Sequence, residues 1–226
     1  MSNNMTELVF ILDRSGSMSG LEDDTIDGFN GMLEKQKKDN TEVNVTTVLF
    51  DDKVDIIHDR FPINIVEPLT DKDYYVRGCT ALLDAIGVAV HKIENVQNHL
   101  PEDHKAGKVI FVITTDGHEN SSKEYSYGQI KKMIEAEKER GWEFLFLGAN
   151  IDAIGEAEKI GISRNRAVTY ENDSEGVAIN YAVVGEAVRC ALSKADNEEE
   201  LFSDDWAGDI EKYHRSINEK KGGKRS

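Results

Sequence analysis

The stretch Ile11–Gly20, ILDRSGSMSG, decides how this chain folds, because an apolar run ends there in an acidic residue followed by serines. The six residues before Asp13, ELVFIL from Glu7 to Leu12, are almost continuously apolar. Such a run is typical of a strand that is buried on both faces of a parallel sheet. Asp13 therefore stands at the carboxyl end of a predicted central strand.

The composition narrows the classes of protein to consider. The sequence has 226 residues, 39% hydrophobic content and a formal net charge of -16, which allows one domain with a hydrophobic core. The acidic balance argues against nucleic acid and anionic membranes as partners, because phosphate groups select clustered Lys and Arg. No apolar stretch has the length of a membrane span and no secretory leader is recognisable, so we expect a cytoplasmic protein. With only Cys79 and Cys190, a disulfide framework is not expected.

The segments that follow the opening stretch predict a helix and then a hairpin. The sequence SGLE from Ser19 to Glu22 has the pattern of a capping box. Apolar residues at helical spacing then predict one buried helix face: Leu21, Ile26, Phe29 and Leu33. Two β-rich runs at 41–50 and 54–65 predict a hairpin with an antiparallel edge strand, where Pro62 is tolerated.

The rest of the chain alternates between helical and strand patterns. Strands are predicted at 108–116, 142–150 and 166–171, and helices at 81–96, 125–140, a short segment ending at Gly161, and 174–193. This alternation predicts an α/β fold with a doubly wound, mostly parallel sheet, one antiparallel edge strand and helices on both faces. We place the domain at residues 6–193.

A composition shift follows this domain, and residues 194–226 are predicted to form an appendage. The acidic stretch ADNEEELFSDD covers 195–205, and Ser203 is predicted to cap a helix. Four apolar or aromatic residues fall on one face of that helix: Trp206, Ile210, Tyr213 and Ile217. The basic tail KKGGKRS at 220–226 is predicted to be disordered.

Oxygen-bearing side chains stand at the ends of several predicted strands or in the loops beside them. In open parallel sheets, ligands bind beyond the carboxyl ends of the strands, where the strand order reverses. Three loops supply hydroxyl and carboxylate groups there, which are the ligands that hard divalent cations prefer. These residues are Asp13, Ser15 and Ser17 from DRSGS, Thr80 from RGCTALLDA, and Asp116 from ITTDGHENS.

The pattern D-x-S-x-S, a distant Thr and a later T-D-G resembles the metal-ion-dependent adhesion site of von Willebrand factor type A (VWA) domains. The resemblance implies a Rossmann-like VWA fold in which Ser15, Ser17 and Thr80 are hydroxyl ligands of Mg²⁺, or of Mn²⁺ in its place. It also implies that Asp13 and Asp116 mainly hold the waters of that ion. One departure concerns the loop before Thr80, where the family commonly has two glycines and this chain has Gly78 followed by Cys79.

The same resemblance implies a function. A cation held by neutral hydroxyls keeps part of its charge uncompensated, so a protein partner that presents an Asp or Glu would complete its coordination. The segment FLFLGANIDAIGEA at 144–157 is similar to stand-alone bacterial or phage members of the family. We therefore expect a non-enzymatic interaction module, whose partner and oligomeric state the sequence leaves open.

Two other classes compete with this interpretation. A flavodoxin-like protein could bind phosphate or flavin at SGSMSG, but the chain has neither G-x-G-x-x-G nor a Walker lysine after the strand. A hydrolase could use the strand-end Asp or Ser, but Ser15 stands where an aspartyl phosphatase needs a second Asp, and Met18 where a nucleophile elbow needs Ser. A zinc site is not expected at His99 and His104 or at His118.

Overall fold

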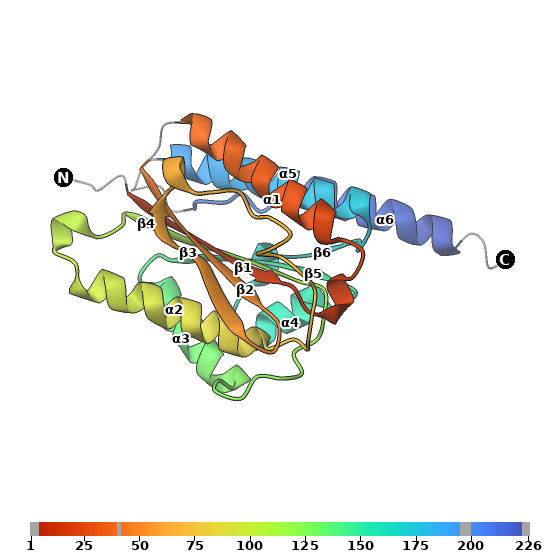
Figure 1. Ribbon diagram of the computed structural model, residues 1–226, viewed down its shortest axis with the longest axis horizontal. Helices are drawn as coiled ribbons and strands as arrows, with labels where there is room; N and C mark the ends of the chain where they lie inside the picture. Colours follow the sequence, from red (N-terminus) through yellow and green to blue (C-terminus); the bar gives the residue numbers. More distant parts are fainter. Residues whose placement is uncertain (1–4, 40–41, 195–199, 223–226) are drawn as a thin grey trace.

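The described residues of the computed structural model, 5–39, 42–194 and 200–222, form one six-stranded sheet between two layers of helices (Figure 1). The strand order is β3-β2-β1-β4-β5-β6, and every neighbouring pair is parallel except β2 and β3. The predicted fold class is confirmed, and Pro62 ends the antiparallel edge strand. The strands are β1 (Thr6–Asp13), β2 (Val43–Phe50), β3 (Val54–Pro62), β4 (Lys108–Thr115), β5 (Glu143–Ala149) and β6 (Ala167–Tyr170).

The helices divide between the two faces of the sheet, as Figure 1 shows. One face is covered by α1 (Glu22–Gln36), α5 (Ser174–Ser193) and α6 (Gly208–Gly222). The other face is covered by α2 (Leu82–His99), α3 (Tyr127–Glu139) and α4 (Ala153–Lys159). Within the part of the chain that the structure describes, none of these helices combines the length and the apolarity of a membrane span.

The position of β1 in the centre of the sheet explains why its sequence is continuously apolar. All eight of its residues are buried, because helices cover both faces of the sheet. Leu8, Phe10 and Leu12 pack in the core beneath α1 and α5. Val9 and Ile11 pack in the core on the side of α2. The strand is thus fixed from both sides, and its last residue, Asp13, is held at the carboxyl edge of the sheet.

Two predicted helix caps are wrong. Ser19 does not cap α1, because a short 3-10 helix (Gly16–Met18) and a left-handed turn at Gly20 (φ 89°) delay the helix until Glu22. The Glu22 carboxylate instead accepts a hydrogen bond from the backbone of Gly20. Ser203 does not cap α6 either, since its carbonyl accepts from Trp206 in a turn that precedes the first residue of the helix, Gly208.

The C-terminal helix α6 packs against the domain, as the apolar face predicted from its sequence indicated. Ile210 is buried, and Trp206 packs against the same core from the turn before the helix. The helix continues to Gly222, so the first three residues of the tail that was predicted to be disordered are helical. The remainder of that tail and residues 195–199 of the acidic stretch lie outside the described residues.

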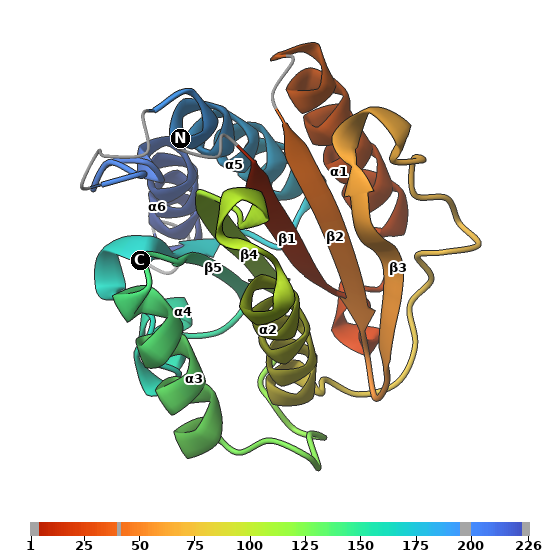
Figure 2. The same cartoon turned by 90° about the vertical axis from the view of Figure 1, so that its left-hand side faces the viewer.

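The strand order defines where a ligand site is expected. From β1 the chain winds outward to β2 and β3, and it then returns to β4 and winds the other way to β5 and β6. Figure 2 shows β1 between β2 and β4, at the point where this direction reverses. Turns that leave the carboxyl ends of two such neighbouring strands diverge and leave a crevice between them.

Candidate metal centre

Three turns at the carboxyl edge of the sheet bring the predicted hydroxyl and carboxylate groups together. Ser15 and Ser17 lie in the turn after β1, Asp116 follows β4, and Thr80 stands just before α2. The Oγ atoms of Ser15 and Ser17 are 3.0 Å apart, and Thr80 Oγ1 donates to Ser15 Oγ over 3.1 Å. The Ser17 hydroxyl also donates to Oδ1 of Asp116. These four residues and Asp13 are called the oxygen cluster below.

Asp13 holds the backbone of the cluster in place. Its Oδ1 accepts a hydrogen bond from the Ser15 backbone at 2.7 Å, and its Oδ2 accepts from Thr115 Oγ1 at 2.6 Å. The carboxylate thereby ties the turn after β1 to the end of β4. Burial raises the pKa of Asp13 above its usual value, although the hydrogen bonds from Thr115 and Ser15 oppose this effect.

The second carboxylate of the cluster lies in a similar environment. Asp116 is only 2% exposed. Burial, together with the negative charge of Asp13, raises the pKa of Asp116 to about 6, against the hydrogen bonds from Ser17 and Asn172. Burying a carboxylate is unfavourable unless a cation or enough hydrogen bonds compensate its charge. A cation beside Asp116 would relieve this cost.

The nearest basic residue in the sequence does not supply that cation. The Arg14 side chain is buried on the other side of the turn, where its Nε lies 2.8 Å from Asp51 Oδ2 and a terminal nitrogen pairs with Asp55. Arg77 joins the same Asp51 oxygen at 2.7 Å. The guanidinium groups of Arg14 and Arg77 are therefore neutralised by Asp51 and Asp55, and no basic side chain of the described residues pairs with Asp13.

The residues of these ion pairs also form backbone hydrogen bonds that connect the turn after β1 and the end of β2 to the loop that carries Thr80. The Arg77 backbone donates to the Arg14 carbonyl at 3.0 Å, and the Ala81 backbone donates to the Asp51 carbonyl at 2.8 Å. The loop that carries Thr80 is thus attached on both sides to buried atoms of the sheet edge. Gly78, which precedes the Cys79 that departs from the family pattern, has a φ of 65°, and its carbonyl accepts from Gly16 in the turn after β1.

Gly117 lies directly against the hydroxyl groups of the cluster. A Cβ atom on Gly117 would lie 2.9 Å from Thr80 Oγ1 and 3.3 Å from Ser17 Oγ. A side chain at this position would therefore crowd the hydroxyl groups. Among the described residues no group of three or more His, Cys, Asp or Glu is arranged to hold a metal, so an ion here would depend on neutral hydroxyl oxygens. The donor set fits a hard divalent cation such as Mg²⁺.

The residues of the cluster differ in their exposure to solvent. Asp13, Ser15, Thr80 and Asp116 are each at most 3% exposed, whereas Ser17 is exposed. A group that approaches from solvent would therefore meet the cluster at Ser17.

Three residues that the sequence analysis did not single out support the cluster. Thr115 bonds to Asp13, as described. Asn120 accepts from the Thr80 backbone at 2.9 Å, and its own backbone donates to the Thr80 carbonyl at 3.1 Å. Asn172 donates to Asp116 Oδ2 at 3.1 Å. The sequence signal for Asn172 was its place directly after the predicted strand 166–171, at the same edge of the sheet.

The histidines are not part of the cluster. The His118 side chain is 67% exposed and its Nδ1 lies 3.7 Å from Glu156. His99 contacts the carbonyl of Asn95 within its own helix. His104 pairs with the neighbouring Asp103.

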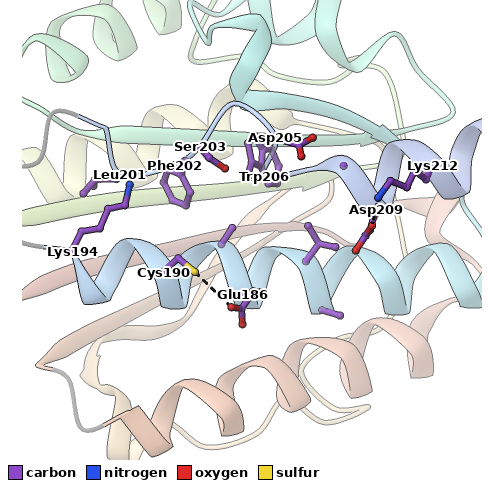
Figure 3. Close-up of a pocket in the computed structure, with 14 residues that line it drawn as sticks. Glu186, Cys190, Lys194, Leu201, Phe202, Ser203, Asp205, Trp206, Asp209 and Lys212 are labelled. Atoms are coloured by element: carbon purple, nitrogen blue, oxygen red, sulfur yellow. Dashed lines mark hydrogen bonds and ion pairs between the residues drawn. The ribbon is translucent and has the colours of Figure 1, made fainter.

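A separate cavity lies between α5 and the segment that leads into α6 (Figure 3). Its volume is about 590 Å³, and its lining includes Val183, Ala187, Leu201, Phe202 and Trp206 but no residue of the oxygen cluster. Cys190 also lines it, with Sγ 3.6 Å from Glu186. Burial and this carboxylate raise the pKa of the Cys190 thiol, which keeps it in the protonated, weakly nucleophilic form.

Solved structures with the same fold come from several kinds of protein. The vWF domain of the type V pili tip protein Mfa5 from Porphyromonas gingivalis has a TM-score of 0.58 and 9% identity, over 86% of this chain and 98% of that chain. The SpRpn10 VWA domain has a TM-score of 0.52 and 12% identity, over 79% and 94%. Each likeness at this identity concerns the fold.

A third structure is longer than this chain. Proximal thread matrix protein 1 from the mussel byssus, solved with a zinc-occupied MIDAS motif, has a TM-score of 0.50 and 13% identity. The match covers 83% of this chain and 47% of that one, so the chain spans about half the length of that relative.

Sequence comparison identifies the family directly. No curated protein matches the chain. A family model of the von Willebrand factor type A domain, however, matches residues 7–182, which is most of the chain and includes every residue of the oxygen cluster. The chain belongs to the von Willebrand factor type A domain family.

Proposed function

We propose that this protein is a non-enzymatic interaction module that binds a protein partner through a divalent metal. The residues that would hold the ion are those of the oxygen cluster: Asp13, Ser15, Ser17, Thr80 and Asp116. Mg²⁺ is the proposed ion, and Mn²⁺ would bind in its place. When bound, the ion would supply a positive charge that attracts an Asp or Glu side chain of the partner.

The observation that carries this proposal is the set of three hydroxyls beside two buried carboxylates that have no basic partner among the described residues. The Ser15 hydroxyl already contacts those of Ser17 and Thr80, so little rearrangement is needed for the three oxygens to face one ion. Asp13 and Asp116 supply negative charge within the same crevice. The zinc-occupied MIDAS motif of the mussel byssus protein supports the idea that this fold can hold a divalent ion.

The exposure of Ser17 supports the proposed role of the partner. Hydroxyl ligands carry no charge, so an ion held by them retains more attraction for an outside carboxylate than one held by several acidic ligands. The net charge of -16 would repel strongly acidic proteins at long range. Screening within about 8 Å at physiological salt lets a single acidic side chain on a neutral or basic surface approach.

The alternatives have less support from the geometry. A phosphate at the turn after β1 would face Asp13 and Asp116 without a cation, because Arg14 is directed to Asp51 and Asp55. A serine hydrolase commonly pairs its nucleophile with a histidine base that a third group orients. The described partners of the Ser15 and Ser17 hydroxyls are other hydroxyls and the Asp116 carboxylate.

The metal part of the proposal can be tested without knowing the partner. Thermal melts with Mg²⁺, with Mn²⁺ and with chelator should show that the ions raise the melting temperature, because a ligand that binds only the native state stabilises it. Asp13→Asn should remove the response while the metal-free protein remains folded. Identical melts of the wild type with metal and with chelator would refute the proposal.

The partner part requires a binding assay. Proteins captured from an extract of the source cells should be retained with Mg²⁺, released by chelator, and weakened by Thr80→Ala. Thr70→Ala is the matched control, since Thr70 is an exposed threonine whose hydroxyl bonds to Asp73 instead. Capture that is equally strong under all of these conditions would show that the oxygen cluster is not the binding surface.

Three finer statements remain predictions from the sequence. These are the cytoplasmic location, the stand-alone bacterial or phage type, and the division into a VWA domain at 6–193 and an appendage at 194–226. Fractionation of the source cells would test the first. Limited proteolysis would test the third, because cleavage within 194–205 should leave a folded domain if the boundary is correct.

A further inference from the structure

The loop between β6 and α5 connects the oxygen cluster to the C-terminal helix. Its three residues, Glu171, Asn172 and Asp173, each contact a different part of the molecule. Glu171 Oε1 lies 3.0 Å from His214 Nδ1, and Asp173 Oδ2 accepts from Tyr213 Oη at 3.2 Å. Asn172, between them, points to the cluster.

The Asn172 amide is placed to serve the cluster in two ways. Its Nδ2 donates to Asp116 Oδ2 at 3.1 Å, while the other oxygen of Asp116 accepts from Ser17. The Asn172 Oδ1 is buried and has no hydrogen-bond partner among the residues that the structure describes. A buried amide oxygen without a partner is unfavourable, so this atom is suited to accept a hydrogen bond from a group bound at the cluster.

The loop is held from both sides, which fixes where the amide points. Asp173 caps α5 by accepting from the Gly176 backbone at 2.7 Å. A Cβ on Gly176 would lie 2.0 Å from the Glu171 carbonyl, so only glycine allows this close approach. On the outer side, Tyr213 of α6 donates a hydrogen bond to Asp173, and the imidazole of His214 lies 3.0 Å from Glu171. The helix α6 lies beyond residues 7–182, which the family model matches.

We propose that Asn172 is a further residue of the metal site and that α6 positions it. The inference rests on the proposed function, because it assigns Asn172 a role toward the ion that the cluster would hold. Asn172 is a positioning residue: Nδ2 orients the Asp116 carboxylate, and Oδ1 accepts a hydrogen bond from a water bound to the ion. Tyr213 and His214 keep the amide in this orientation through Asp173 and Glu171.

The first test compares metal affinity with metal-free stability. Mn²⁺ is titrated calorimetrically into the full chain, and each variant is also melted in chelator. Asn172→Ala should weaken Mn²⁺ binding about 10- to 100-fold, the usual effect of losing a residue that orients a metal ligand. Its melting temperature in chelator should stay close to that of the wild type. Asn95→Ala, an exposed asparagine near the far end of α2, should change neither quantity.

A second variant separates the loss of hydrogen bonds at Asn172 from the loss of side-chain volume. Asn172→Leu has nearly the same shape but can neither donate nor accept, and it should weaken Mn²⁺ binding as much as Asn172→Ala does. The contribution of α6 is tested with Tyr213→Phe, which removes only the hydroxyl that bonds to Asp173. It should weaken Mn²⁺ binding less than Asn172→Ala, and the neighbouring Lys212→Ala, whose partner is Asp209, should have no effect.

The outcomes separate this inference from the proposed function. A wild-type protein that does not bind Mn²⁺ overturns both. A wild type that binds, with Asn172→Ala and Asn172→Leu binding equally well, overturns only the inference, even if their melting temperatures in chelator fall. Mn²⁺ binding that Tyr213→Phe leaves unchanged, while both Asn172 variants bind weakly, overturns the role of α6.

Discussion

Replacing Gly117 by alanine should block the proposed metal site with little effect on the fold. The added Cβ would lie 2.9 Å from Thr80 Oγ1 and 3.3 Å from Ser17 Oγ, which places it among the oxygens that would face the ion. Gly117 does not have a left-handed backbone conformation, so alanine introduces no backbone strain. The atoms that it meets are tips of short side chains, and we expect a cost of about 1 kcal/mol in the metal-free protein.

The loss of the metal response should be much larger than that cost. At a metal concentration of about 100 times Kd, binding stabilises the native state by about 2.7 kcal/mol. For a domain of this size, each kcal/mol changes the melting temperature by about 2 to 4 °C. The wild type should therefore melt about 5 to 11 °C higher with Mg²⁺ than with chelator, and Gly117→Ala should show no such difference.

Thermal melts followed by circular dichroism, in Mg²⁺ and in chelator, measure both quantities. Gly31→Ala is the matched control, because a Cβ on this glycine of α1 would meet nothing within 4 Å. It should keep the full metal response and gain slightly in stability from the better helix propensity of alanine. A Gly117→Ala protein that retains the wild-type shift with Mg²⁺ would refute the placement of the ion beside Thr80 and Ser17.

Two further predictions concern pH and the buried charges. Burial acts to raise the pKa of Asp51, but the hydrogen bonds that its carboxylate accepts from Arg77 and Arg14 hold that pKa below the usual value. Asp51→Asn should therefore cost about 3 to 5 kcal/mol at neutral pH in chemical denaturation, and the difference from wild type should shrink as the pH falls below about 4. An undiminished difference at low pH would contradict this. Burial raises the pKa of Asp116 to about 6, so the free energy of unfolding of the wild type in chelator should fall by about 3 kcal/mol as the pH rises from about 4 through 6. Asp116→Asn should abolish that fall. Parallel pH profiles of the two proteins would show that the carboxylate is not destabilised by burial.

Much of the fold could be predicted because its signals are local in the sequence. The apolar run before Asp13 identifies a strand that is buried on both faces, and the spacing of Phe29 and Leu33 identifies a buried helix face. The cap at Ser19 was predicted from the capping-box pattern and the cap at Ser203 from its residue type, and both predictions were wrong. A cap depends on where the backbone turns into the helix, and the left-handed turn at Gly20 moved that point beyond Ser19.

The candidate site was predictable to a similar extent and for a similar reason. Each motif lies within a few residues of a strand end or a helix start, so the sequence alone could place Asp13, Ser15, Ser17, Thr80 and Asp116 at one edge of the sheet. Their contact in one cluster agrees with that placement. Their role as metal ligands stays a prediction until the melts are measured.

The sequence by itself determined which residue types stand at the strand ends and that a parallel sheet carries them. Only the tertiary structure decided their surroundings. It turned Arg14 toward Asp51 and away from Asp13, and it brought Asn172 to Asp116 across 56 positions of the chain. Contacts of this kind depend on β1 lying beside β4 and on α6 packing over the end of β6. Strand order and helix docking are set by burial of the whole core, which no local pattern contains.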